Sequence, residues 1–150
     1  MKILFITLSN IGDCILTLPV LDRLRVKYPQ AKITCLVPAR PQEIFLNNPA
    51  VDRVIIFDKH AKLRQKIKLF FSLSREKYDE VIDLRNSFFG AFLPAKKRSS
   101  PMRLIPKEIK HMQERHLFWA DLLNTPLKDS SLLALNISVS DKQFIRKILN

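Results

Sequence analysis

Hydrophobic residues are grouped along the chain in short continuous runs, separated by longer segments with helical spacing. Four such runs, rich in Ile, Leu, Val and Phe, predict β-strands at residues 2–8, 33–37, 53–57 and 80–84. These runs show no alternation with polar residues, which is typical of strands that are covered on both faces of a parallel sheet. We therefore predict an α/β fold, a Rossmann-like parallel sheet with flanking helices and right-handed crossovers.

Five segments with helical spacing lie between and after these strands, at residues 12–27, 41–47, 61–74, 107–123 and 141–149. The first helix is expected to be buried at its beginning and exposed at its charged end, which includes Asp22. The third helix carries an apolar stripe that consists of Leu63, Ile67, Phe70 and Phe71. After residue 86, prolines and a basic run break the pattern, so we expect an irregular excursion at the carboxyl edge of the sheet.

The length of 150 residues and the hydrophobic fraction of 47% fit one packed domain and argue against disorder. No apolar run approaches the roughly 20 residues that span a bilayer. The opening MKILFITLSN predicts a strand and carries no cleavable signal pattern. From these features we expect a cytoplasmic protein without a transmembrane helix.

The cysteines and histidines do not form a recognisable metal or redox motif. Cys14 and Cys35 are too far apart for a CxxC pair and are expected to be buried free thiols. His60, His111 and His116 lack the spacing of a zinc or non-haem iron site. The sequence therefore predicts no metal site.

The formal net charge is +12, and it is unevenly distributed. Residues 59–115 hold 15 Lys or Arg against 6 Asp or Glu. On the third predicted helix, Lys62 and Lys66 lie one turn apart, as do Arg64 and Lys68, away from the apolar stripe. Such charges form either an ordinary solvated face or a surface that attracts an anionic partner such as acidic lipid. Nucleic acid would use the same charges, but no recognised motif accompanies them, so it is not expected.

The first junction between a strand and a helix contains Ser9, Asn10, Gly12 and Asp13. Ligands of open α/β sheets bind at such junctions. Gly12 is one of only two glycines, so we expect a backbone conformation or a close contact that a Cβ would forbid. Asp13 has two interpretations, a helix-capping residue or a general base at the mouth of the crevice, and spacing alone favours the commoner capping role.

The fourth predicted strand ends at a second candidate carboxylate. Asp83 is expected to cap the following loop, and Arg85 either faces an anionic ligand or pairs with Asp83. Further along, His111 and Arg115 lie one helical turn apart, on a face that is solvated or meets another domain. Trp119 lies on an apolar stripe and is expected in the core.

Four segments carry a family resemblance, namely ILFITLSNIGDCILTLPVLDRLRVKYPQAKI, NPAVDRVIIF, YDEVIDLRNS and HMQERHLFWADLL. In this order they resemble the amino-terminal half of the ADP-heptose:lipopolysaccharide heptosyltransferases, glycosyltransferase family 9, over residues 1–123. The most specific element is the LSxxGDxxxxxP string at residues 8–19. The resemblance implies a GT-B enzyme, in which the first Rossmann-like domain binds the acceptor and the second binds the nucleotide sugar. Residues 1–150 would be the acceptor-side domain. The carboxyl-terminal nucleotide-sugar domain that ADP-heptose needs would be absent from this chain.

The resemblance also assigns roles to individual residues. It implies that Asp13 is the catalytic base of an inverting transfer that requires no metal or other cofactor. The implied acceptor-binding residues are Ser9, Asn10, Gly12, Lys62, Arg64, Lys66 and Arg85. Thr7 and Arg85 depart from the family, in which Arg and Gln or His are the more usual residues at these places.

The partners that the resemblance implies are a lipid-linked, phosphorylated sugar acceptor and the cytoplasmic surface of the inner membrane, to which the protein would bind peripherally. The isolated 150 residues are expected to be catalytically silent. The alternative is a noncatalytic Rossmann-like module that binds acidic lipid or nucleic acid through its basic face.

Overall fold

The computed structural model describes residues 1–85, 87–99, 104–122, 143 and 146–148. Within these residues the chain forms a parallel five-stranded sheet of order β3-β2-β1-β4-β5. The strands are β1 (Lys2–Ile6), β2 (Lys32–Pro38), β3 (Arg53–Phe57), β4 (Tyr78–Asp83) and β5 (Ala95–Arg98). The helices are α1 (Ile11–Lys27), α2 (Gln42–Leu46), α3 (Leu63–Arg75), α4 (Phe88–Phe92) and α5 (Met112–Trp119). This confirms the predicted α/β class with a parallel sheet and flanking helices.

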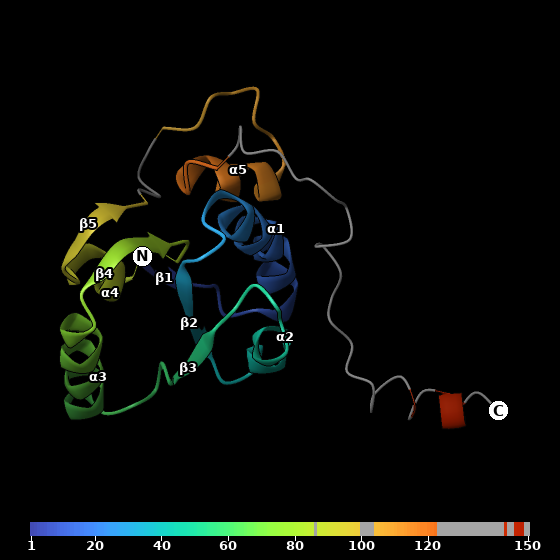
Figure 1. The fold of residues 1–150 in the computed structure, drawn as a ribbon. Helices are drawn as coiled ribbons and strands as arrows, with labels where there is room; N and C mark the ends of the chain where they lie inside the picture. The colour runs from blue at the N-terminus through green and yellow to red at the C-terminus, as the bar shows by residue number, and fades with distance from the viewer. Residues whose placement is uncertain (86, 100–103, 123–142, 144–145, 149–150) are drawn as a thin grey trace.

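The helices lie on both faces of the sheet, with α1 and α2 on one side and α3 and α4 on the other (Figure 1). The central strand β1 contributes to both layers. Ile3 and Phe5 belong to the core cluster that includes α1, whereas Leu4 and Ile6 belong to the cluster on the face of α3. Because successive side chains of a strand point to opposite faces, an unbroken apolar run is what a strand buried on both faces requires.

The predicted irregular excursion after residue 86 is wrong at residues 88–92, which form α4, and at residues 95–98, which form β5. Residues 104–110 contain no helix or strand, as expected. The sequence of β5 is AKKR, and its last three residues are exposed. It pairs with β4 at the end of the sheet. Charged residues are common on such edge strands because they discourage pairing with a further strand. A strand of this kind has no apolar run, so the hydrophobic pattern did not predict β5.

The helix predicted at 107–123 is shorter than expected. It begins only after His111, whose backbone is extended, and it ends at Trp119, which is half-buried rather than enclosed in the core. The helix predicted at 141–149 falls mostly outside the described residues.

Helix α1 was predicted to be buried at its beginning and exposed at its end, and the structure reverses part of this pattern. Ile11, Ile15 and Leu16 near its start are 45%, 38% and 38% exposed. Asp22, expected at the exposed end, is buried, and its Oδ2 has no hydrogen-bond partner among the described residues. Burial raises the pKa of Asp22 to about 6.

The glycine that makes a close contact is Gly90, not Gly12 as expected from the sequence. Apart from its chain neighbours and the backbone of its own helix, no heavy atom lies within 4 Å of the position that a Cβ on Gly12 would occupy, so the expected constraint at Gly12 is wrong. At Gly90 in α4, a Cβ would overlap the carboxylate of Asp83. The close approach that requires glycine is therefore the packing of α4 against the end of β4.

Substitution of the two glycines by alanine tests this difference. We expect Gly90→Ala to lower the free energy of unfolding by about 1–3 kcal/mol, because the added methyl group must displace Asp83. Gly12→Ala, on a helical residue with open space around it, should be neutral or stabilising by up to about 1 kcal/mol. Urea denaturation measures both values, and equal effects at the two positions would contradict the assignment.

The buried Asp22 predicts a specific pH dependence. Its folded-state pKa lies above the unfolded value, so its contribution to stability is complete below about pH 4 and is lost as the pH rises through about 6. Relative to Asp22→Asn, the unmodified chain should lose about 2–3 kcal/mol of unfolding free energy between pH 4 and pH 7.

Asp52→Asn is the control for this titration, because the pKa of Asp52 is shifted in the opposite direction. Burial raises the pKa of Asp52, but the Ile33 N–H and Arg25 outweigh it, and the net pKa is lowered. Its stabilising contribution is therefore present above the unfolded pKa and is lost as the pH falls. Parallel stability profiles for Asp22→Asn and the unmodified chain would show that Asp22 does not titrate as described.

Candidate functional site at the carboxyl edge of the sheet

A small buried network fixes the turn between β1 and α1. The Thr7 hydroxyl lies 3.2 Å from that of Thr17 and donates to the Cys14 sulfur at 3.6 Å. The Cys14 thiol donates to the Leu8 carbonyl at 3.2 Å, and Thr17 donates to the Cys14 carbonyl at 2.6 Å. Burial raises the pKa of Cys14. Cys14 and Cys35 are both buried free thiols, as predicted.

This network presents Asp13, the residue before Cys14, in the first turn of α1. Asn10 is the N-cap residue, with extended backbone and no side-chain capping hydrogen bond. Its side-chain amide instead donates to Asp13 Oδ2 at 3.0 Å. The Asp13 side chain is half-buried, so it is not sealed from solvent. Ser9 is half-buried and Gly12 is exposed, so the four residues form one accessible junction.

The sequence did not indicate His116 as a neighbour of this junction. His116 is buried where α5 packs against α1, and its Nδ1 has no partner within the described part of the chain. Burial lowers the pKa of His116, whereas the Leu16 carbonyl and the charge of Asp13 act in the opposite direction. Only the packing of two helices that are distant in sequence brings this group close. At the N-cap of α5, His111 is exposed, whereas Arg115, expected on the same solvated or interdomain face, is half-buried and its Nε is buried.

Asp83 confirms its predicted role as a cap for the loop after β4. It accepts hydrogen bonds from the Arg85 N–H at 2.9 Å and from the Ser87 N–H and hydroxyl at 2.6 and 2.9 Å. Burial raises the pKa of Asp83, and these donors partly oppose the shift. The Arg85 guanidinium lies over the ring of Phe57, 5.5 Å from its centroid. The side chain of Arg85 is thereby directed along the edge of the sheet.

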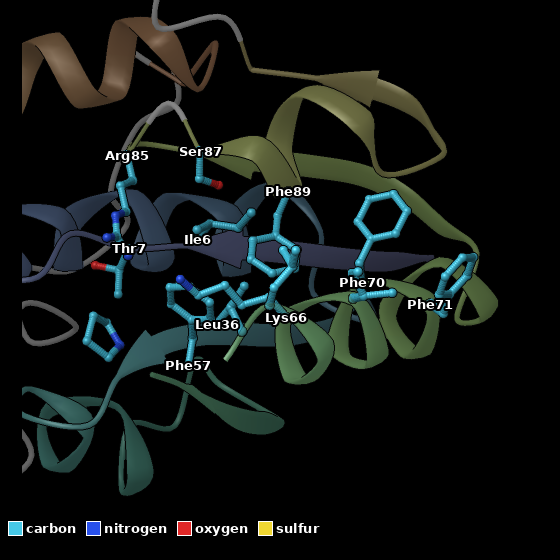
Figure 2. Close-up of a pocket in the computed structure, with 13 residues that line it drawn as sticks. Ile6, Thr7, Leu36, Phe57, Lys66, Phe70, Phe71, Arg85, Ser87 and Phe89 are labelled. Carbon is cyan, nitrogen blue, oxygen red and sulfur yellow. The ribbon is translucent and has the colours of Figure 1, made fainter. Parts of the chain in front are cut away.

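A cavity of about 740 Å³ opens between α3 and the ends of the central strands. Its wall is mainly apolar and includes Thr7, Leu36, Phe57, Ile67, Phe70 and Phe89. Figure 2 shows Ile6 and Leu36 of the sheet between Arg85 at one end and Phe70 and Phe71 at the other. We call this cavity the α3 trough.

The structure brings together only some of the predicted acceptor-binding residues. Lys66 and Arg85 both line the α3 trough, whereas Lys62 and Arg64 are exposed outside its wall. The junction residues Ser9, Asn10, Gly12 and Asp13 are likewise not part of the wall. Thr7 connects the two places, because it lines the trough and also bonds within the junction network.

The apolar stripe of α3 differs from a stripe packed into the core. Leu63, Ile67 and Phe71 are 73%, 47% and 58% exposed. Together with Phe70, they line the trough. Their helical spacing correctly predicted the helix and its apolar face, but spacing alone does not show whether that face is filled by the protein itself.

Comparison with known proteins decides the family. The chain is 31% identical to lipopolysaccharide heptosyltransferase 3 of Escherichia coli over 139 residues, which covers 85% of the chain and 38% of that protein. It is 34% identical to lipopolysaccharide heptosyltransferase 2 of Escherichia coli K12 over 97 residues, covering 63% of the chain and 28% of that protein. The chain belongs to the heptosyltransferases of glycosyltransferase family 9.

The solved structure of E. coli ADP-heptose lps heptosyltransferase II agrees with this family assignment. It superimposes on this heptosyltransferase-family chain with a TM-score of 0.75 and 26% identity, over 100% of the chain and 51% of the solved structure. The chain thus spans less than half the length of the curated relatives and about half of this structure, which is consistent with an amino-terminal half. No family model matches the chain. Across the described helices, none has the length and apolar character needed to cross a membrane.

Removal of the Ser87 hydroxyl should show how firmly the loop after β4 is held. Ser87→Ala deletes a donor to Asp83 and an acceptor for the Gly90 N–H. We expect a loss of about 1–2 kcal/mol in unfolding free energy and a further rise in the pKa of Asp83. Ser72→Ala, at an exposed helical position, is the matched control and should be nearly neutral. An unchanged Asp83 titration, followed by carboxyl NMR, would contradict this role.

Proposed function

We propose that this chain is the acceptor-binding half of an inverting glycosyltransferase that moves a heptose from ADP-heptose to the inner core of lipopolysaccharide. The observation that carries the proposal is the accessible carboxylate of Asp13 in the first turn of α1, at the carboxyl edge of a parallel sheet. Ligands of open α/β sheets bind at this edge. The two E. coli relatives are both lipopolysaccharide heptosyltransferases, which supports the proposed substrate class.

In the proposed reaction, Asp13 acts as the general base. An acceptor sugar hydroxyl loses its proton to the Asp13 carboxylate while its oxygen forms a bond to the anomeric carbon of the heptose. The bond between that carbon and the phosphate oxygen breaks, and ADP leaves with the electron pair. This single displacement inverts the anomeric configuration. The Asn10 amide, bonded to Asp13 Oδ2 at 3.0 Å, orients the carboxylate.

Several residues would hold the acceptor around this base. Ser9, Asn10 and Gly12 would shape the pocket for the sugar. The cations Lys62, Arg64, Lys66 and Arg85 would meet the phosphates of a lipid-linked acceptor. Such an acceptor would place the protein at the cytoplasmic surface of the inner membrane, bound peripherally, since basic residues near anionic lipid contribute about 1 kcal/mol each.

The donor would need the nucleotide-sugar domain, in the same polypeptide or as a partner. Without that domain nothing in the proposed site orients the anomeric carbon, and transfer depends on that orientation. The chain alone should therefore show no turnover of ADP-heptose. The alternative of a noncatalytic module for acidic lipid or nucleic acid is not favoured, since both compared relatives are heptosyltransferases.

Substitution of the base tests the proposal. The assay is heptose transfer from ADP-heptose by the chain supplied with the nucleotide-sugar domain of a family member. Asp13→Asn keeps the shape of the side chain but removes the proton acceptor, so kcat should fall by roughly 10²–10⁴-fold with little change in the KM for the acceptor.

Glu43→Gln is the control, because Glu43 is also an acid in the first turn of a helix, α2, and is solvent-exposed. It should leave transfer unchanged. An Asp13→Asn enzyme that retains full kcat would refute the proposed role of Asp13.

A further inference from the structure

The α3 trough has the exposed apolar side chains and the volume of a ligand-binding site. Leu63, Ile67 and Phe71 are large apolar side chains, and each is nearly half exposed or more. Clusters of exposed apolar side chains of this kind mark binding grooves or interfaces. The volume of about 740 Å³ lies within the roughly 300–1,000 Å³ that is typical of small-molecule sites.

Contacts between aromatic rings hold the wall of the trough in place. The Phe57 and Phe89 rings meet edge to face with centroids 5.3 Å apart. Phe70 lies 6.3 Å from Phe89 and 5.9 Å from Phe71. These rings come from β3, α3 and α4, so the apolar wall is assembled from three separate elements.

Among the described residues, the charged side chains that line the trough are both positive. Lys66 and Arg85 line it, and no Asp or Glu does. Helix α3 itself contains no acidic residue. Among the described residues, neither Lys66 nor Arg85 forms an ion pair. The Lys66 ammonium donates to the Lys59 carbonyl at 2.7 Å, and Arg85 acts on Asp83 through its charge. A ligand that is apolar along its length and anionic at one end matches this arrangement.

The direction of the trough orients such a ligand. Arg85 lies at the end nearest the β1–α1 junction, and Phe71 lies at the opposite end, along α3 (Figure 2). Thr7 lines the trough and contacts Cys14, the residue next to Asp13. An anionic head at Arg85 would therefore be close to the proposed base, with its tail directed away from it.

We propose that the α3 trough holds one acyl chain of an anionic, lipid-linked acceptor, with Lys66 and Arg85 at its phosphate. The inference rests on the proposed function and deepens it, because it makes the lipid tail part of acceptor recognition. The apolar stripe faces a cavity between the helix and the sheet, which fits a single chain better than the flat surface of a bilayer.

The test is binding of alkyl phosphates to the 150-residue chain, below the micelle concentration, by calorimetry and NMR. Dodecyl phosphate should bind saturably, with shifts at Ile67 and Phe89. Shortening the chain should weaken binding by roughly fourfold for each methylene. Inorganic phosphate alone should bind much more weakly, which distinguishes the amphiphile from a simple anion.

Matched variants locate the site. Ile67→Asp places a charge in the trough and should weaken binding by about tenfold or more. Leu46→Asp, on α2 at an equally exposed position, should bind like the unmodified chain. Lys66→Gln should reduce the preference for dodecyl phosphate over dodecanol, whereas Lys68→Gln, outside the trough wall, should not.

The inference would be overturned if dodecyl phosphate did not bind saturably, or if Ile67→Asp bound it as well as the unmodified chain. It would also be overturned if the unmodified chain formed a dimer that Ile67→Asp dissociates. A fourth contrary result would be that Ile67→Asp weakens binding to lipid vesicles but not to monomeric dodecyl phosphate. Asp13→Asn should bind dodecyl phosphate normally. Loss of transfer with normal alkyl phosphate binding, or the reverse, therefore separates failure of this inference from failure of the proposed function.

Discussion

The site depends on the burial of β1 on both faces of the sheet. β1 pairs with β2 on one side and with β4 on the other, and Ile6 lies in register with Leu36 and Asp83. The hydrogen bonds continue past the strand, from the Thr7 N–H to the Leu36 carbonyl at 3.3 Å and from the Leu84 N–H to the Ile6 carbonyl at 3.1 Å. The two loops that carry the candidate chemistry are thereby placed side by side by backbone pairing.

Two chemically different surfaces share this edge. The β1–α1 junction is polar, and its carboxylate is oriented by an amide. The α3 trough is apolar, and its walls are aromatic rings. The loop after β4 contacts both surfaces. Asp83 accepts hydrogen bonds from backbone N–H groups of this loop, and Arg85 extends over the ring of Phe57. These contacts place the Arg85 cation between the polar and the apolar surface.

Much of this arrangement could be predicted from the sequence, for physical reasons. Unbroken apolar runs identify buried parallel strands, and a polar junction after the first strand identifies the edge where ligands bind. The edge strand β5 could not be found in this way, because its lysines face solvent. The burial of His116 and of Asp22 depends on packing between distant elements. The exposure of the apolar face of α3 could not be predicted either, because a helix packed into the core has the same spacing of apolar residues.

The glycines show the limit of arguing from residue type. Rarity alone pointed to Gly12, yet the position without room for a Cβ is Gly90, where a Cβ would overlap the Asp83 side chain. A contact of this kind depends on how α4 packs against β4, and a local sequence pattern does not predict that packing. The role of Asp13 as a base stays a prediction. A general base must be accessible, but most surface carboxylates are accessible too.

The thiol of Cys14 connects the core to the loop that carries Asp13. It is buried, and it donates to the Leu8 carbonyl within the turn itself. Because Cys14 is fully buried in the core cluster, a reagent can reach its sulfur only when the packing around the turn opens. The rate at which Cys14 is alkylated therefore reports how often this turn opens. Alkylation of Cys14 would thus measure local opening next to the proposed base.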